Sequence, residues 1–151
     1  MNETAVNTET PTSERQMVHF VGAGPGDPEL ITVKGQRLLH EAELVIYTGS
    51  LVPEPLVTGL NGEVFNSAGM NLDEVFELIL KSWQQGKKIV RLHTGDPAIY
   101  GAINEQIALL KQHDIPFLVV PGVSSGTASA AALKTELTLP EVSQTVIFTR
   151  R

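Results

Sequence analysis

Residues 89–101 begin as a short apolar run and then break at Gly95-Asp96-Pro97. The break predicts a tight turn, and residues 98–112 after it predict a helix. Two other Gly- and Pro-rich breaks, at residues 22–28 and 121–126, also follow apolar runs. An open α/β sheet binds its ligands outside the carboxyl ends of its strands. Three such loops at one sheet edge therefore predict a single ligand site.

The rest of the chain alternates short apolar runs with amphipathic segments. We expect strands at residues 17–22, 44–47, 63–66, 88–93 and 117–120. Helices are expected at residues 28–42, 72–85, 98–112 and 124–134, with only a short helical turn near residues 53–55. This order predicts an α/β domain whose mostly parallel five-stranded sheet carries helices on both faces.

The clearest helix signal lies at residues 72–85. Apolar side chains recur there at helical spacing and include Phe76 and Trp83, which we interpret as core residues. Asn71 followed three residues later by Glu74 resembles a capping box, and Gly86 suits the helix end.

The two ends of the chain differ from its middle. Residues 1–16 are polar and predict a disordered tail with no signal peptide. Residues 17–136 would form the α/β domain. Residues 144–150 are typical of a strand, reached through a linker that starts at residue 137. Because a domain rarely ends on a new strand, we interpret residues 137–151 as the start of a truncated second domain that is largely absent.

Composition excludes several classes of function. The net charge is −6 and the basic residues are scattered, which argues against nucleic acid as a partner. No apolar run reaches the roughly 18 to 20 residues that a membrane helix needs. The chain has no cysteine, so disulfides and thiolate metal ligands are excluded. A cytoplasmic protein that does not bind membranes is expected.

Two glycine motifs invite familiar interpretations. The loop Gly22-Ala23-Gly24-Pro25-Gly26-Asp27 lacks the third glycine of a dinucleotide-binding turn and the Gly-Lys-Ser/Thr of a phosphate-binding loop. The loop Gly122-Val123-Ser124-Ser125-Gly126 matches the pattern of a hydrolase nucleophile elbow. No histidine follows Ser124, so a serine hydrolase stays a minor alternative, and Ser124 as a helix N-cap is the other interpretation.

Single polar residues near the turns leave alternatives open. His93 ends a strand beside the central turn and is either structural or directed at a ligand. Asp96 either caps the following helix or accepts a hydrogen bond from a ligand. The four histidines do not cluster at metal-ligand spacing, so no metal site is expected.

Together these motifs resemble a known family, the tetrapyrrole methylases. The similarity covers about residues 17–151 and rests on residues 21–32, on Gly95-Asp96-Pro97-Ala98-Ile99-Tyr100-Gly101 and on residues 121–125, in the family's order and spacing. Residues 47–53 and 136–145 resemble the branch of the family that methylates C-11 of precorrin-4 or cobalt-precorrin-4.

The resemblance implies the first domain of a two-domain enzyme that transfers a methyl group from S-adenosyl-L-methionine to a tetrapyrrole, a corrin precursor of cobalamin. The cofactor-binding residues it implies by position are Pro25, Thr94, Gly95, Asp96, Ile99, Ser124 and Ser125. No catalytic residue is assigned, since orientation of a nucleophilic carbon would suffice.

Two further expectations accompany this resemblance. Arg91 or Arg150 would help to hold the carboxylates of the macrocycle, and the protein would form a homodimer. The alternative is a half-site that folds or dimerises without turnover.

Overall fold

A computed structural model describes residues 16–49 and 51–149 of the 151-residue chain. Apart from Gln16, the expected tail lies outside the described residues. Five strands form one sheet in the order β3-β2-β4-β1-β5, and all neighbouring pairs are parallel. The strands are β1 (Val18–Gly22), β2 (Leu44–Tyr47), β3 (Glu63–Asn66), β4 (Ile89–His93) and β5 (Phe117–Val120). The predicted five-stranded α/β fold is confirmed.

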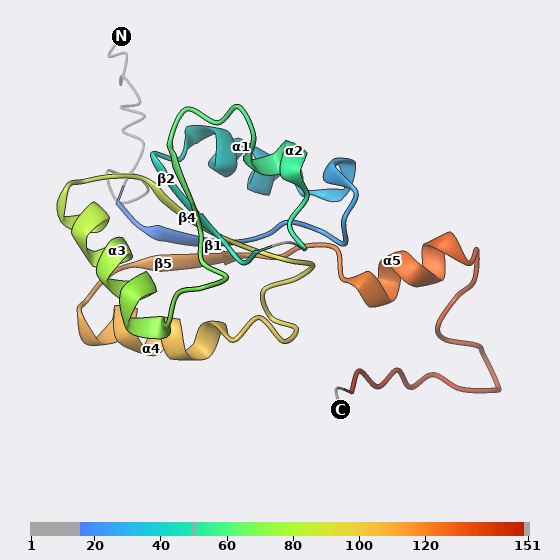
Figure 1. The fold of residues 1–151 in the computed structure, drawn as a ribbon. Coiled ribbons are helices and arrows are strands. Elements are labelled where there is room, and N and C mark those ends of the chain that lie inside the picture. The colour runs from blue at the N-terminus through green and yellow to red at the C-terminus, as the bar shows by residue number, and fades with distance from the viewer. Residues whose placement is uncertain (1–15, 50, 150–151) are drawn as a thin grey trace, which may run out of the picture.

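Helices cover both faces of this sheet (Figure 1). Helices α1 (Val33–Glu41) and α2 (Glu54–Val57) pack on one face against a cluster that contains Val45, Val90 and Leu92. Helices α3 (Leu72–Gln84) and α4 (Ile103–Gln112) pack on the other face, where Phe20 and Ile46 lie. Because every central strand has apolar neighbours on both sides, β1 and β4 are buried along their whole length.

Helix α3 follows the sequence prediction closely. Asn71 accepts a hydrogen bond from the Glu74 amide at 2.9 Å, and the Glu74 carboxylate accepts one from the Asn71 amide at 2.8 Å. This reciprocal pair is the expected capping box. Phe76 is buried in the core as predicted, and Trp83 is partly buried beside it.

For two helices, the predicted first residue is wrong. Residues 28–42 form a single turn of 3-10 helix, Pro28–Leu30, and then α1, because Thr32 leaves the helical conformation and caps α1 by accepting from the Gly35 amide. Residues 98–102 are not helical, and α4 begins only at Ile103. Tyr100 and Ala102 adopt left-handed φ angles of 55° and 49°, which no right-handed helix contains.

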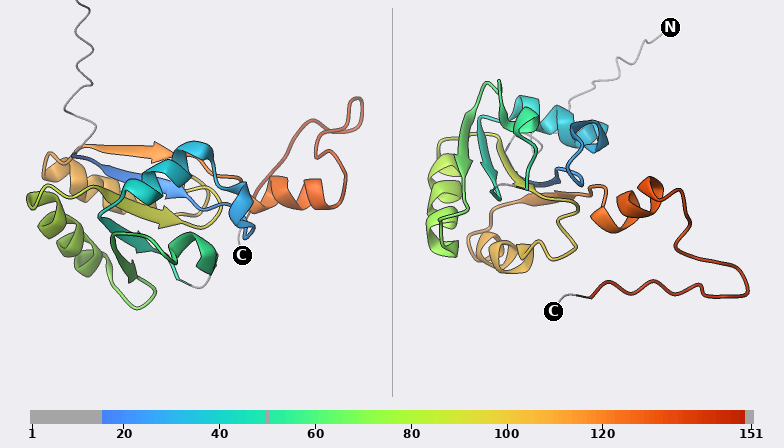
Figure 2. Two further views of the ribbon diagram at one scale, coloured as in Figure 1. Left: turned by 90° about the horizontal axis from the view of Figure 1, so that it is seen from above. Right: turned by 45° about the vertical axis from the view of Figure 1, so that its right-hand side comes forward.

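Beyond the sheet, α5 (Ser125–Ala132) projects away from the carboxyl edge, and the chain then turns back beneath it (Figures 1 and 2). The strand expected at residues 144–150 is not formed over its described residues, 144–149. A strand requires a hydrogen-bonded neighbour, and no described segment pairs with this one. The division of the chain at residue 137 stays a prediction.

Candidate functional site

Three loops meet at the carboxyl edge of the sheet, and the absence of side chains at Gly22 and Gly122 allows them to touch. A Cβ atom added to Gly22 would lie 2.6 Å from both the Gly122 Cα and the Gly95 carbonyl oxygen. One added to Gly122 would lie 2.8 Å from the Gly22 Cα. Real side chains do not approach backbone so closely, so only glycine fits at this crossing. The loops after β1, β4 and β5 therefore form one connected unit.

Backbone hydrogen bonds join the first two of these loops. The Gly95 amide donates to the Gly24 carbonyl at 2.8 Å, and the Gly24 amide donates to the Gly95 carbonyl at 3.2 Å. Both glycines have positive φ angles, 81° at Gly24 and 59° at Gly95. The Ala23 amide donates to the His93 carbonyl at 2.7 Å, which continues the pairing of β1 with β4 past the strand end.

The Asp96 carboxylate ties the second loop to the third. Its Oδ1 accepts from the Ala98 amide at 2.7 Å, and its Oδ2 accepts from the Gly122 amide at 3.0 Å. Both oxygens are thus used within the protein, although a carboxylate oxygen has a second lone pair for a ligand. The prediction that Asp96 caps the following helix is wrong, because α4 begins only at Ile103 and its N-cap is Ala102. Asp96 instead closes a turn with Ala98 and reaches Gly122, 26 residues away, a contact that the sequence did not indicate.

Ser124 is the N-cap of α5. Its side chain accepts from the Gly126 amide at 3.2 Å, and its φ and ψ angles of −71° and 145° are those of ordinary extended backbone. A nucleophile elbow would hold its serine in a strained turn, so the structure favours the capping interpretation over the hydrolase one. Ser125, the first residue of the helix, is exposed at the same edge.

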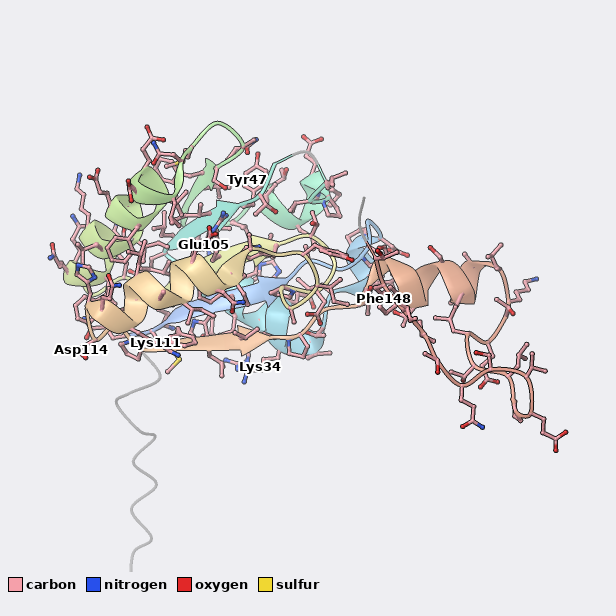
Figure 3. All side chains as sticks on the ribbon, turned by 90° about the horizontal axis from the view of Figure 1, so that it is seen from below. Lys34, Tyr47, Glu105, Lys111, Asp114 and Phe148 are labelled. Atoms are coloured by element: carbon pink, nitrogen blue, oxygen red, sulfur yellow. The ribbon has the colours of Figure 1, made fainter. Side chains whose placement is uncertain are left out.

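The third loop also contacts the end of the described chain. Phe148 lies beside the first turn of α5 (Figure 3), and a Cβ atom added to Gly126 would overlap its ring. The Phe148 side chain remains about half exposed, at 49%. Residues 144–149 therefore return to the loop that carries Ser124 and Ser125.

A hollow of about 490 Å³ opens at the same edge, over the ends of β1, β2 and β3. Its lining includes Pro25, Gly26, Tyr47, Gly49, Val57 and Asn66. Of the predicted cofactor residues, Pro25 alone borders it. The residues that follow β2 and β3 were not assigned to the site from sequence, although their position at strand ends was a signal that could have identified them.

Ile99 lies in the loop between β4 and α4, about one third exposed, and Thr94 is partly buried directly after β4. The structure thus places all seven predicted cofactor residues at one sheet edge, in three loops. It brings these loops into contact through the Gly95 backbone and the Asp96 side chain.

Two charged or titratable side chains lie beneath this edge. Arg91 is 5% exposed, and burial lowers its pKa to about 10, so it stays protonated at neutral pH. Its Nε donates to the Gln106 Oε1 at 3.0 Å, and its Nη1 donates to the Ile46 carbonyl at 3.1 Å. The expectation from the sequence that Arg91 would help to hold the macrocycle is therefore wrong, because its side chain is not at the surface. Arg150, the other candidate, lies outside the described residues.

His93 is 2% exposed and packs against Phe20, with ring centroids 5.9 Å apart. Burial, followed by the charge of Arg91, lowers the pKa of His93 to about 3, so the imidazole is neutral. Its Nε2 and the Thr48 hydroxyl are buried without hydrogen-bond partners among the described residues. The structural interpretation of His93 is the better supported one.

The described part of the chain contains no group of three side chains arranged to bind a metal ion. None of its helices combines the length and apolar character that crossing a bilayer requires.

Known proteins resemble this chain in sequence. A family model for tetrapyrrole (corrin/porphyrin) methylases matches residues 17–151. A cobalt-precorrin-4 C(11)-methyltransferase from Methanocaldococcus jannaschii is 59% identical over 135 residues, which are 88% of this chain and 52% of that protein. The chain thus spans about half the length of this curated relative.

Solved structures are similar as well. The X-ray structure of a cobalt precorrin-4 methyltransferase matches with a TM-score of 0.87 and 48% identity, covering 92% of this chain and 59% of that one. A uroporphyrin-III C-methyltransferase from Thermus thermophilus, complexed with S-adenosylhomocysteine, matches with a TM-score of 0.70 and 37% identity. That match covers 85% of this chain and 53% of the other.

Proposed function

Because this chain belongs to the tetrapyrrole methylase family, we propose that it forms the first half of an S-adenosyl-L-methionine-dependent enzyme that methylates C-11 of precorrin-4 or cobalt-precorrin-4 in cobalamin biosynthesis. The observation that carries this proposal is the junction of three loops through Gly22, Gly95 and Gly122. The junction presents backbone and small side chains at one sheet edge, where an α/β protein binds its ligand.

The residues at this edge fit the cofactor chemically. Its methionine part carries an amine and a carboxylate, and its adenosine part carries polar edges on a flat ring. Backbone groups near Gly95 and the hydroxyls of Thr94 and Ser125 would serve the polar parts. Ile99 and Pro25 would supply apolar contact, while Asp96 and Ser124 hold the loops in shape.

The bound cofactor would supply an electrophilic methyl group on a sulfonium centre. The protein's task is then to orient the acceptor carbon of the tetrapyrrole and to exclude water, which are effects of proximity rather than of acid–base chemistry. No described side chain at the edge combines exposure with a shifted pKa, since His93 and Arg91 are both buried. We therefore assign no catalytic residue.

Calorimetry with S-adenosylhomocysteine tests the site. We expect binding by a protein that joins this chain to the second half found in its relatives. Ser125→Trp should abolish it, because a large side chain at the exposed start of α5 would occupy the space in front of the loop junction. Ser129→Trp, one turn further along α5 and also exposed, is the matched control and should bind normally. Equal binding by both variants, or none by the unmodified protein, would contradict the site.

A second candidate is a half-site that folds without turnover. The chain spans about half the length of its curated relative. Transfer of a radiolabelled methyl group to a tetrapyrrole by the 151-residue chain alone would eliminate this candidate. Size-exclusion chromatography with light scattering on the same sample would test the homodimer, which stays a prediction.

A further inference from the structure

The loop at residues 97–102 has an unusual backbone. Tyr100 and Ala102 both adopt left-handed φ angles, although neither is glycine. A Cβ atom added to Gly101 would lie 3.1 Å from the Pro97 Cα and closer still to the Pro97 carbonyl oxygen, so the loop is folded tightly on itself. Such conformations persist only where surrounding structure holds them.

Part of that support comes from one polar side chain. Gln106, on the first turns of α4, donates from Nε2 to the Ala102 carbonyl at 3.4 Å. Ala102 caps α4 without any side-chain hydrogen bond of its own. The Gln106 side chain is therefore the one side-chain group among the described residues that bonds to the end of the loop.

Gln106 is itself held by Arg91. The guanidinium group can only donate hydrogen bonds, so its bond to Oε1 fixes which end of the Gln106 amide faces Ala102. A second guanidinium bond, to the Ile46 carbonyl, anchors Arg91 to β2. Arg91 makes no ion pair within the described part of the chain. Burying an arginine without a carboxylate is unfavourable, which indicates that its fixed geometry has a use.

We propose that Arg91 and Gln106 are positioning residues that hold the 97–102 loop, and with it Ile99, in the shape that receives the cofactor. The proposal rests on the function proposed above. Neither side chain would touch the cofactor, because both are more than nine-tenths buried. They act through the Ala102 carbonyl at the loop's end.

Gln106→Glu separates this role from simple core packing. A carboxylate still accepts from Arg91, now as a charge-assisted bond, but it cannot donate to Ala102. We expect unchanged or higher stability to urea. The amides of residues 98–102 should exchange with deuterium about five- to tenfold faster, the ratio that loss of one hydrogen bond gives. Gln36→Glu, the same change at an exposed site on α1, should leave exchange in the loop unchanged.

A second substitution tests the strain directly. Ala102→Gly makes the left-handed conformation easy, so adding it to Gln106→Glu should restore slow exchange. Gln106→Met removes the donor as well, so it should also loosen the loop, but it leaves the buried Arg91 Nε unpaired and should lower the stability to urea, unlike Gln106→Glu. The proposal is wrong if Gln106→Glu and the unmodified protein exchange alike, or if exchange rises equally throughout α4 and β4.

Cofactor affinity gives the second readout. In a protein that binds S-adenosylhomocysteine, Gln106→Glu should raise the dissociation constant by a similar factor, and Ala102→Gly should reverse the change. If the unmodified protein binds no cofactor, the proposed function fails, while deuterium exchange still decides whether Arg91 and Gln106 hold the loop.

Discussion

Replacing Gly122 by alanine should destabilise the fold strongly, because the added methyl group has no room at the sheet edge. The new Cβ would lie 2.8 Å from the Gly22 Cα and closer still to the Gly95 carbonyl oxygen. Both are backbone atoms, so neither can rotate out of the way as a side chain could. Overpacking of this kind typically costs about 1–3 kcal/mol. Separating the loops would also weaken the two Gly24–Gly95 hydrogen bonds, at about 1 kcal/mol each. We therefore expect a loss of roughly 3–5 kcal/mol in the free energy of unfolding.

Urea denaturation followed by the fluorescence of Trp83, the single tryptophan, measures this loss. Gly69→Ala is the matched control, because a Cβ there meets nothing within 4 Å. It should change stability by no more than about 1 kcal/mol, and in the stabilising direction if at all. Gly126→Ala should fall between the two, since the Phe148 ring can swing away. If Gly122→Ala proved as stable as Gly69→Ala, the contact of the three loops would be refuted.

Three other predictions concern single side chains. The pKa of His93 is about 3 in the folded protein and near its ordinary 6.5 when unfolded, so stability should fall as pH drops from 6.5 toward 3. The slope from this group is at most about 1.4 kcal/mol per pH unit, and His93→Phe should flatten the decline in urea titrations across that range. Asn71→Ala should lower stability by about 1 kcal/mol through loss of the α3 cap, measurable by thermal unfolding. Asp96→Ala should remove two hydrogen bonds and destabilise by about 2 kcal/mol, whereas Asp96→Asn, which keeps one acceptor, should lose about half of that in the same assay.

Local signals predicted most of the architecture. Short apolar runs identified all five strands, and the capping box at Asn71 and Glu74 identified the start of α3. These features depend on residues close together in the chain, so propensity and periodicity suffice to find them. The start of α4 could not be found in this way. Ala98, Ile99 and Ala102 are compatible with a helix, and only the tight packing of the loop and its bond to Gln106 override that preference.

The same distinction between local sequence signals and long-range contacts applies to the candidate site. The sequence by itself predicted three of the loops at this edge, because a glycine-rich turn after a buried strand is recognisable without coordinates, but it did not assign the residues after β2 and β3 that border the hollow. It also determined the family, through motifs in fixed order. Only the tertiary structure decided how the loops are joined and which polar groups are free to act. Asp96 reaches Gly122 across 26 residues, and Arg91 is turned inward to Gln106 instead of outward to a substrate. Such contacts link residues far apart in the chain, and their energy exists only once the sheet has brought the strand ends together.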